Sequence, residues 1–503
     1  MLLKNIPTLL ICLSLITESF GQIKDCLILK RQTQIDSILI VFPDSVIKQR
    51  EILITGANID NLKAFNNIHT IKGNVIIKNT SIDSLVGLEN LKLLYTLELD
   101  SNYSLQYIAK FKYLIDIRSL SIKDCPVLKS LDFIEAIETL GNLEIFGNTQ
   151  NLKKISNLSK LKQLYNFSLI SNVGMDTVQF SDDLEINDII IYGNQNLIYF
   201  YGANNKNNLS NSDDGYFRCN SLFISDNNKL SYINCSNKTH CFDQVNISNN
   251  PFLQSLTVGE FSDSIALDVE ISSNKTLEYF TALNNIKSSR FVNITNNENL
   301  KELNCFKNLK STLNISISKN PTLQKLYGAF ANVDTLGQSG APKSGLSIYL
   351  NKKLNSIEEF SNVKYFNSVA ISLNKRLGLC SIKSICNHIE TGRPIELDAD
   401  NAPGCRSINQ IRLGCTSYTE NVEKDLREFE LYPNPTTDRV TVQGSDIHKI
   451  DIIHPDGKLM KHIEADEISS QEIDISSLPP AVYIVIVTYG PNHFTKALKC
   501  IKI

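Results

Sequence analysis

Apolar residues recur along most of the chain in one short pattern. It reads apolar, any residue, apolar, two residues, asparagine, two residues, apolar, two residues, apolar, as in LELDSNYSLQYI from Leu97, VNISNNPFLQSL from Val245 and VNITNNENLKEL from Val292. The asparagine returns at intervals of about 23 residues between Asn102 and Asn374. A short and steady period is typical of a solenoid, in which each repeat forms one coil that packs against its neighbours.

The first part of the pattern predicts a strand, because alternate side chains of a strand point to the same face. Stacked coils then form a parallel sheet. The asparagine ends the strand and should turn inward, where its amide can bond backbone groups released by the turn and form a ladder with its neighbours. The expected ladder comprises Asn102, Asn148, Asn172, Asn194, Asn227, Asn250, Asn274, Asn297, Asn320, Asn351 and Asn374. Cys125 takes the same position in one coil and is small enough to be buried there.

The repeats differ from ordinary leucine-rich repeats in the position of the next apolar residue, which follows the asparagine by three positions instead of two. Together with linkers such as IKGNVIIKNTSIDSLVGLENLKLLYTLEL, from Ile71 to Leu99, this offset resembles the receptor L-domain type of leucine-rich repeat over roughly residues 50–380. The resemblance implies a mainly β, right-handed leucine-rich-repeat solenoid spanning residues 22–378. It also implies a ligand-binding scaffold without naming a ligand.

Residues 379–418 carry a cluster of four cysteines, Cys380, Cys386, Cys405 and Cys415. In an exported protein such a cluster predicts two disulfides, and the sequence leaves three pairings open. A zinc site is the alternative, although no CxxC pair is present. Apolar residues at Ile382, Ile385 and Ile389 predict a short helix. A solenoid needs a cap over its last open core, and this segment resembles the cysteine-containing caps of secreted bacterial proteins with such repeats.

The C-terminal part begins with LYPNPTTDRVTV, after a linker at residues 419–429. Period-two alternation at residues 440–442, 449–453, 471–475 and 482–489, with turn signals between, predicts a small β-sandwich over residues 430–503. This order of segments resembles the C-terminal sorting domain of bacterial type IX secretion substrates, with Pro433, Asn434 and Pro435 as the sorting motif. Ala481 departs from the glycine usual in that family. The resemblance implies the type IX secretion machinery as a partner.

The N-terminus predicts a signal peptide over residues 1–21, with Lys4 before an apolar run from Ile6 to Ile16 and small residues near Gly21. No later segment has 18 consecutive apolar residues, so no transmembrane segment is expected. The net charge of −3 argues against nucleic acid as a partner. We therefore expect a protein that is secreted or held on the outer surface of a Gram-negative bacterium.

The sequence contains no recognised catalytic motif. The seven histidines are scattered, and HExxH, GxSxG and phosphate-binding loops are missing from the sequence. We therefore expect no enzyme, no cofactor and no metal, with an enzyme of unrecognised type or a structural surface-layer component as the alternatives.

Aromatic residues offer a binding surface instead. Five of them come from two successive coils and are expected to gather in one region: Tyr192, Tyr199, Tyr201, Phe223 and Tyr232. Exposed aromatic rings suit a glycan or a protein ligand, and the alternative is that they only cover the flank of the solenoid. An insertion at residues 204–220 lies beside them. Cys219 and Cys241 are nearly one coil apart in sequence and are candidates for a further disulfide.

Overall fold

The computed structural model describes most of the 503-residue chain. The described residues are 25–147, 149–156, 158–181, 184–202, 221–235, 244–258, 267–280, 283–284, 286–337, 345–393, 395–422, 429–454, 458–489 and 494–503. The chain divides into two units, Met1–Cys415 and Thr416–Ile503. The predicted signal peptide lies outside the described residues.

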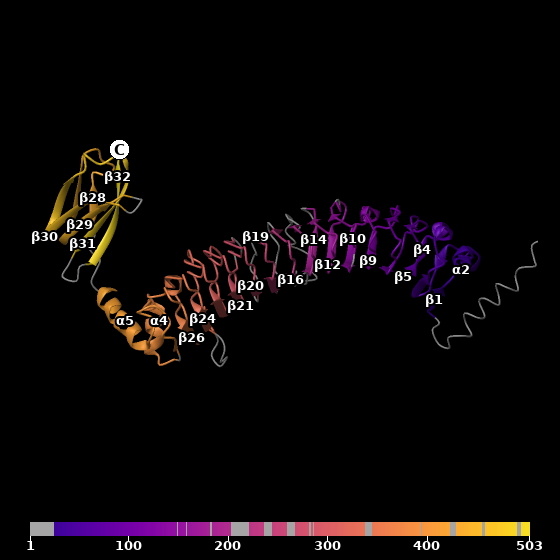
Figure 1. Ribbon diagram of the computed structural model, residues 1–503, viewed down its shortest axis with the longest axis horizontal. Helices are drawn as coiled ribbons and strands as arrows, with labels where there is room; N and C mark the ends of the chain where they lie inside the picture. The colour runs from indigo at the N-terminus through magenta and orange to yellow at the C-terminus, as the bar shows by residue number, and fades with distance from the viewer. Residues whose placement is uncertain are drawn as a thin grey trace, which may run out of the picture. The chain divides into compact units, whose positions relative to one another are not determined.

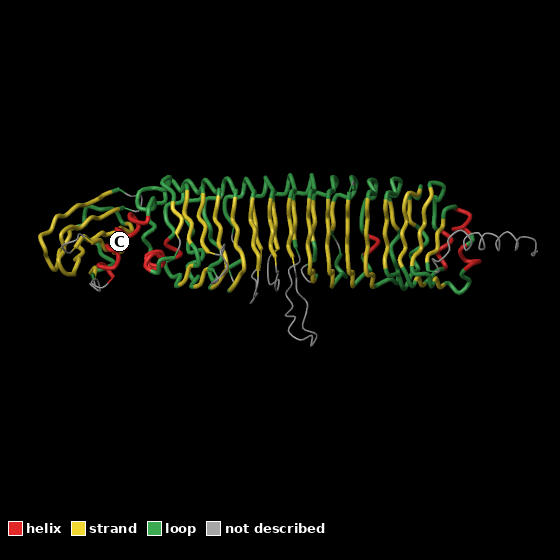
Figure 2. The backbone as a smooth tube through the Cα atoms, turned by 90° about the horizontal axis from the view of Figure 1, so that it is seen from below, coloured by secondary structure: helices red, strands yellow, loops and turns green. Residues whose placement is uncertain are grey.

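The first unit is a mainly β solenoid of about 14 turns (Figure 1). Its main sheet has 18 strands, and the strands of successive coils pair in parallel. They are β1 (Cys26–Leu29), β3 (Glu51–Gly56), β5 (Asn74–Thr80), β7 (Thr96–Asp100), β9 (Asp116–Lys123), β10 (Thr139–Phe146), β12 (Gln163–Ile170), β14 (Glu185–Tyr192), β16 (Ser221–Ser225), β18 (Gln244–Ser248), β20 (Leu267–Ser272), β21 (Ser288–Thr295), β22 (Ser311–Ser318), β23 (Thr335–Leu336), β24 (Gly345–Tyr349), β25 (Tyr365–Phe366), β26 (Val369–Ser372) and β27 (Ile395–Leu397). Figure 2 shows these strands lying side by side along the solenoid.

The apolar pattern explains why each coil forms such a strand. In β7, Leu97 and Leu99 are fully buried, whereas Glu98 between them is half-exposed. The two leucines therefore enter the core of the coil and the glutamate lies on the outer face of the sheet. Because every coil repeats this arrangement, the cores of successive coils merge into one continuous apolar interior.

A second, shorter sheet follows the asparagine turn. Its parallel strands are β11 (Lys154–Ile155), β13 (Thr177–Gln179), β15 (Tyr199–Tyr201), β17 (Tyr232–Cys235) and β19 (Ser255–Val258). Nearer the N-terminus, two separate strand pairs form in the same way. These are β2 (Val46–Ile47) with β4 (Thr70–Ile71), and β6 (Ser84–Leu85) with β8 (Tyr107–Ile108).

Helical segments form part of several coils and cover the N-terminal end of the solenoid. Two short helices, α2 (Gln32–Asp36) and α3 (Ile38–Val41), follow β1 and bury Ile35 and Ile38 against the first coils. Three 3-10 helices, η1 (Lys63–Asn67), η2 (Asp132–Ile134) and η3 (Glu358–Phe360), each bury a phenylalanine. The N-terminal helices were not predicted from the sequence, because their apolar residues do not follow the repeat pattern.

The C-terminal cap is built by helices α4 (Lys383–Glu390) and α5 (Ile408–Val422) around strand β27. Two disulfides join its parts, Cys380 to Cys405 and Cys386 to Cys415. This pairing selects one of the three connectivities and excludes the zinc alternative. Helix α5 continues past residue 418, so the first residues of the predicted linker are helical.

The second unit is a curled antiparallel sheet (Figure 1). Its strands are β28 (Glu430–Tyr432), β29 (Arg439–Ile453), β30 (Leu459–Asp474), β31 (Ala481–Tyr489) and β32 (Phe494–Lys502). The first part of β29 pairs with β28 and its second part pairs with β31, while β30 pairs with both parts. One sheet thus curls around its own apolar core and forms the small β unit predicted for residues 430–503.

Candidate functional site

The inward-turned asparagines form a continuous hydrogen-bonded ladder inside the solenoid. Asn227 shows the repeating arrangement: its Oδ1 accepts from the backbone N–H of Asn194 at 3.1 Å, and its Nδ2 donates to the carbonyl of Ile191 at 3.1 Å. The side chain therefore bonds backbone groups of the preceding coil. Equivalent bonds place these asparagines in the ladder, each of them fully buried: Asn172, Asn194, Asn227, Asn250, Asn274, Asn297, Asn320, Asn351 and Asn374.

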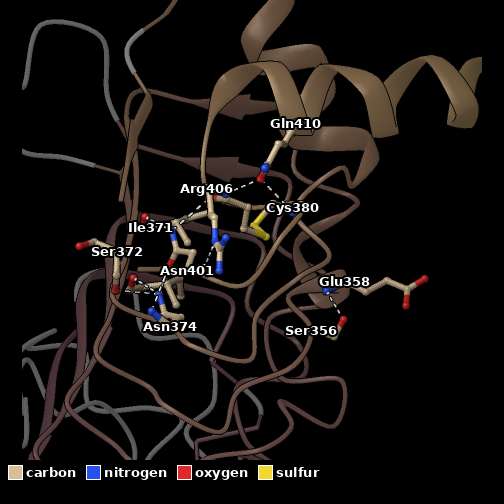
Figure 3. The surroundings of a disulfide bond; sticks show 12 residues. Ser356, Glu358, Ile371, Ser372, Asn374, Cys380, Asn401, Arg406 and Gln410 are labelled. Atoms are coloured by element: carbon tan, nitrogen blue, oxygen red, sulfur yellow. Dashed lines mark hydrogen bonds between the residues drawn. A yellow bond between two sulfur atoms is a disulfide. The ribbon is translucent and has the colours of Figure 1, made fainter. Parts of the chain in front are cut away.

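The ladder continues into the cap, beyond the residues expected from the sequence. Asn401 accepts from the backbone N–H of Asn374 at 2.9 Å and donates to the carbonyl of Ile371 at 2.8 Å. Its own carbonyl accepts from Arg406 Nε at 2.8 Å (Figure 3). The chain around it reads IELDADN, one residue longer between strand and asparagine than the repeat pattern. That extra residue places Asn401 outside the spacing of the repeat pattern.

The N-terminal end of the ladder uses other small residues. Thr80 donates its hydroxyl to Asn102 Oδ1 at 2.7 Å, and Cys125 is fully buried at the ladder position of its coil. In the next coil the predicted Asn148 lies outside the described residues, and Thr149 beside it is fully buried and bonds Asn172 through its hydroxyl. In the repeat pattern an apolar residue follows the ladder position by three, and Leu152 follows Thr149 by three. This spacing could have identified Thr149 as the ladder residue of its coil.

The tyrosines of the second sheet form a compact exposed group. Strands β15 and β17 align Tyr199 with Tyr232 in register. The rings of Tyr199 and Tyr232 are stacked with centroids 5.3 Å apart, and those of Tyr199 and Tyr201 with centroids 6.1 Å apart. Each of the three side chains is more than a third exposed. We call Tyr199, Tyr201 and Tyr232 the tyrosine triad.

The other two predicted aromatic residues lie on the main sheet. The rings of Tyr192 and Phe223 are 6.4 Å apart, on strands β14 and β16. They belong to a wider apolar surface, because Phe146 and Ile170 align with Tyr192 on neighbouring strands and Ile190 aligns with Phe223. Tyr192 and Phe223 thus lie on a different sheet from the tyrosine triad. The turn between Tyr192 and Tyr199 sends the chain from one sheet to the other and divides the five residues into two groups.

The insertion at residues 204–220, Cys219 and Cys241 all lie outside the described residues. The cysteines Cys125, Cys235 and Cys305 are buried and free.

Several titratable groups of the solenoid have displaced pKa values. A hydrogen bond to Glu135 raises the pKa of Lys110, and one from Lys162 lowers the pKa of Glu138. Burial raises the pKa of Glu359. Within the described ranges, no three His, Cys, Asp or Glu side chains are grouped to hold a metal ion. The displaced acidic and basic groups of the described solenoid are thus two exposed ion pairs and a half-buried carboxyl, and the remaining displaced groups are cysteine thiols.

The predicted sorting motif lies against the last strand of the second unit. Asn434 Nδ2 donates to the carbonyl of Lys499 at 2.6 Å, and the peptide bonds before Pro433 and Pro435 are both cis. The chain bends at residues 433–435, and the side chain of Asn434 holds this segment to β32. No helix among the described residues is long and apolar enough to cross a membrane.

Comparisons with known families match two parts of the chain. Residues 45–136 match the Receptor L domain family, and residues 430–501 match the family described as Secretion system C-terminal sorting domain. No curated protein and no solved structure matches the chain significantly. The sorting domain indicates secretion or export to the cell surface, and it implies handling by the secretion machinery. The chain is thus a β-solenoid with a receptor L-domain region, and it carries a type IX secretion C-terminal sorting domain.

Proposed function

We propose that this protein is a non-catalytic recognition protein that binds a glycan through the tyrosine triad. In this proposal it is secreted or held on the outer surface of a Gram-negative bacterium. The sorting domain and the receptor L-domain region support export and a binding type of fold. The observation that carries the proposal is the set of three nearly parallel, exposed rings at Tyr199, Tyr201 and Tyr232.

The triad has the chemistry that a sugar ring requires. Tyrosine combines an apolar ring, against which the C–H face of a sugar can pack, with a hydroxyl that forms hydrogen bonds. The strands around it carry uncharged residues at the positions aligned with the three tyrosines, namely Thr177, Gln179, Asn234 and Ser255. A surface of this composition favours a neutral ligand over a charged one.

The triad is also held in place before any ligand arrives. The parallel pairing of β15 with β13 and β17 fixes the backbone on both sides of Tyr199. Each ring is further restrained by its stacked neighbour. Because little side-chain freedom is lost on binding, the entropic cost of recognition is small.

A glycan array probed with the full secreted chain tests the proposal. We expect saturable binding to a neutral glycan, and we expect Tyr199→Ala and Tyr232→Ala each to weaken it by about tenfold or more, as for central aromatic contacts. Tyr107→Ala is the matched control, since Tyr107 occupies the same position of its own coil and is 52% exposed. Unchanged binding in the two triad variants would contradict the proposal.

The non-catalytic part of the proposal has a separate test. The displaced acidic and basic side chains of the described solenoid are two exposed Lys–Glu ion pairs and a half-buried carboxyl, which gives no support to a pair of acid and base side chains acting on one substrate. Incubation of the full chain with the bound glycan should leave the glycan intact by mass spectrometry. Shortened or modified glycan would favour an enzyme instead.

A further inference from the structure

We propose that the outer face of the C-terminal sheet is the surface that a protein of the secretion machinery recognises. The inner face of this sheet is already occupied, because it packs on its own core around Tyr483, Val485 and Val487. The opposite side of the same strand presents aliphatic side chains to solvent. These side chains take no part in the fold core.

The centre of this surface is a row of aliphatic residues that crosses three strands. Leu459 of β30 aligns with Ile453 of β29, and Ile453 aligns with Ile484 of β31. Leu459 is 52% exposed and Ile484 is 43% exposed. Aligned residues on neighbouring strands lie side by side on one face of a sheet, so the row is continuous.

Two further positions widen the row. Val482, which is 42% exposed, aligns with Ile501 of the last strand, and Ile486 aligns with Ala497. The surface therefore reaches from β30 to β32. We call it the outer aliphatic face and define it by Ile453, Leu459, Val482, Ile484, Ile486 and Ile501.

A contiguous exposed aliphatic surface of this kind is unusual on a protein that stays soluble by itself, and such surfaces mark interaction sites. The match to the sorting-domain family provides the partner, because it implies that the secretion machinery must recognise this unit. The family match does not identify the surface of the unit that the machinery contacts. The fold selects the outer aliphatic face, since the other face of the sheet is buried.

The charges around the face favour a protein over a lipid surface. Lys499 is aligned with Ile484 on one side, and on the other side Asp451 is aligned with Ile486 and is paired with Lys449 and His462. Charges of both signs at the border suit a partner protein with an apolar centre and complementary charges, and they set its orientation. An anionic membrane would instead require basic residues without carboxylates.

An export assay with the full chain tests this inference. The parent chain and Ile484→Glu are expressed in a bacterium that possesses type IX secretion, and the exported fraction is compared with the fraction retained in the periplasm. We expect Ile484→Glu to lower the ratio of exported to retained protein by about tenfold, as for a buried central contact. Ser470→Glu is the control, because Ser470 is an exposed residue of the same sheet outside the outer aliphatic face.

A second variant separates recognition from folding. Ile484→Thr keeps a β-branched side chain that suits a strand, and it should lower export several-fold while hydrogen exchange of the buried β31 amides stays as in the parent. Three results would overturn the inference. These are normal export of the folded Ile484→Thr and Ile484→Glu chains, equal loss of export in Ser470→Glu, or a parent dimer that Ile484→Thr dissociates without changing export. The last result would assign the face to a second copy of the chain.

Discussion

The side chain of Asn434 forms hydrogen bonds with the backbone of β32, at Lys499 and Ile501, as a neighbouring strand would. Its side-chain Oδ1 accepts from the backbone N–H of Ile501 at 2.8 Å, across a sequence separation of 67 residues. Thr436 extends the contact, because its N–H donates to the carbonyl of Ile501 at 2.9 Å and its carbonyl accepts from Ile503 N–H at 3.0 Å. The Pro-Asn-Pro segment and the final residues therefore form one hydrogen-bonded unit within the sorting domain.

Replacing Asn434 with alanine should loosen that unit. The change removes the bonds to Ile501 and Lys499, each worth about 0.5–1.5 kcal/mol net, and leaves those backbone groups to water. We expect hydrogen exchange of the Ile501 amide to become about tenfold faster, measured by mass spectrometry on the full chain. Thr437→Ala, at an exposed neighbouring position, should leave it unchanged. Equal protection in Asn434→Ala would refute a structural role for this side chain.

The asparagine ladder should contribute strongly to solenoid stability. Asn227→Ala leaves the buried Asn194 N–H and Ile191 carbonyl without their partner, at a cost of about 1–3 kcal/mol for each such group. Urea denaturation should show a lower midpoint for this variant. Asn228→Ala is the control, because its side chain is exposed in the same turn, and it should change stability by less than about 0.5 kcal/mol. Similar midpoints for both variants would argue against the ladder.

The cap disulfides should stabilise the last coils. Cys405→Ser opens a covalent loop between residues 25 positions apart, and the expected loss is about 2–4 kcal/mol. Thermal unfolding followed by circular dichroism should begin at a lower temperature in this variant and in the reduced parent. Cys26→Ser should behave as the parent, since Cys26 is a free cysteine far from the cap in sequence. A reduced parent with an unchanged melting curve would disprove the stabilisation.

The buried thiols should be unreactive in the folded protein. Burial raises the pKa of Cys125 to about 11 and that of Cys235 to about 12, and it also raises the pKa of Cys305. Since the thiolate is the reactive form, alkylation at pH 8 should be slow until urea is added. Among the free cysteines of the described residues, partly buried Cys26 should react first. Rapid labelling of Cys305 in the native state, located by peptide mass spectrometry, would contradict this.

Because folding raises the pKa values of these thiols, we expect the folded protein to lose stability in alkaline solution. Their pKa values are raised by folding, so the neutral thiols stabilise the native state fully below the unfolded value of about 9. That stability is lost as the pH rises through the folded values, because the unfolded chain releases protons first. The urea midpoint should therefore fall above about pH 9, and by less in Cys125→Ser.

His462 should titrate above its ordinary range. Hydrogen bonds to Asp451 and then to Glu464 raise the pKa of its imidazole, while the charge of Lys449 opposes them. The charged form therefore stabilises this part of the sheet below the unfolded pKa, and the effect disappears as the pH rises through the folded pKa. Nuclear magnetic resonance titration should show a lower pKa in Asp451→Asn. An identical titration curve would exclude the contact with Asp451.

The coil and its ladder could be predicted from the sequence, because the spacing of apolar residues and asparagine in each repeat is compatible with few backbone conformations. The apolar residues flanking Glu98 point inward together only in a strand, and an asparagine at a strand end has few other ways to bond the turn. Thr149 and Asn401 were missed because each follows an extra residue that breaks the spacing. A pattern defined by fixed intervals cannot detect such residues unless the next apolar position is also used.

Other features depended on distances that sequence spacing does not define. The pairing of Cys380 with Cys405 follows from how α4 and α5 fold back on the last coil. The separation of Tyr192 from Tyr199 follows from a change of sheet at the asparagine turn. The outer aliphatic face was present in the sequence as alternation at residues 482–489, but alternation does not say whether the second face of a strand is covered.

The bonds of Asn250 to other coils reach only the neighbouring coil on either side, through Asn227, Ile224 and Asn274. Removing the 23 residues from 228 to 250 would bring Asn274 to the same bonding position beside Asn227. The gene can therefore lengthen or shorten this protein by duplicating or deleting whole coils, and the remaining coils keep their bonds. Single-residue insertions are restricted to the turns, as beside Thr149. Solenoid length can thus evolve independently of the export signal that follows it.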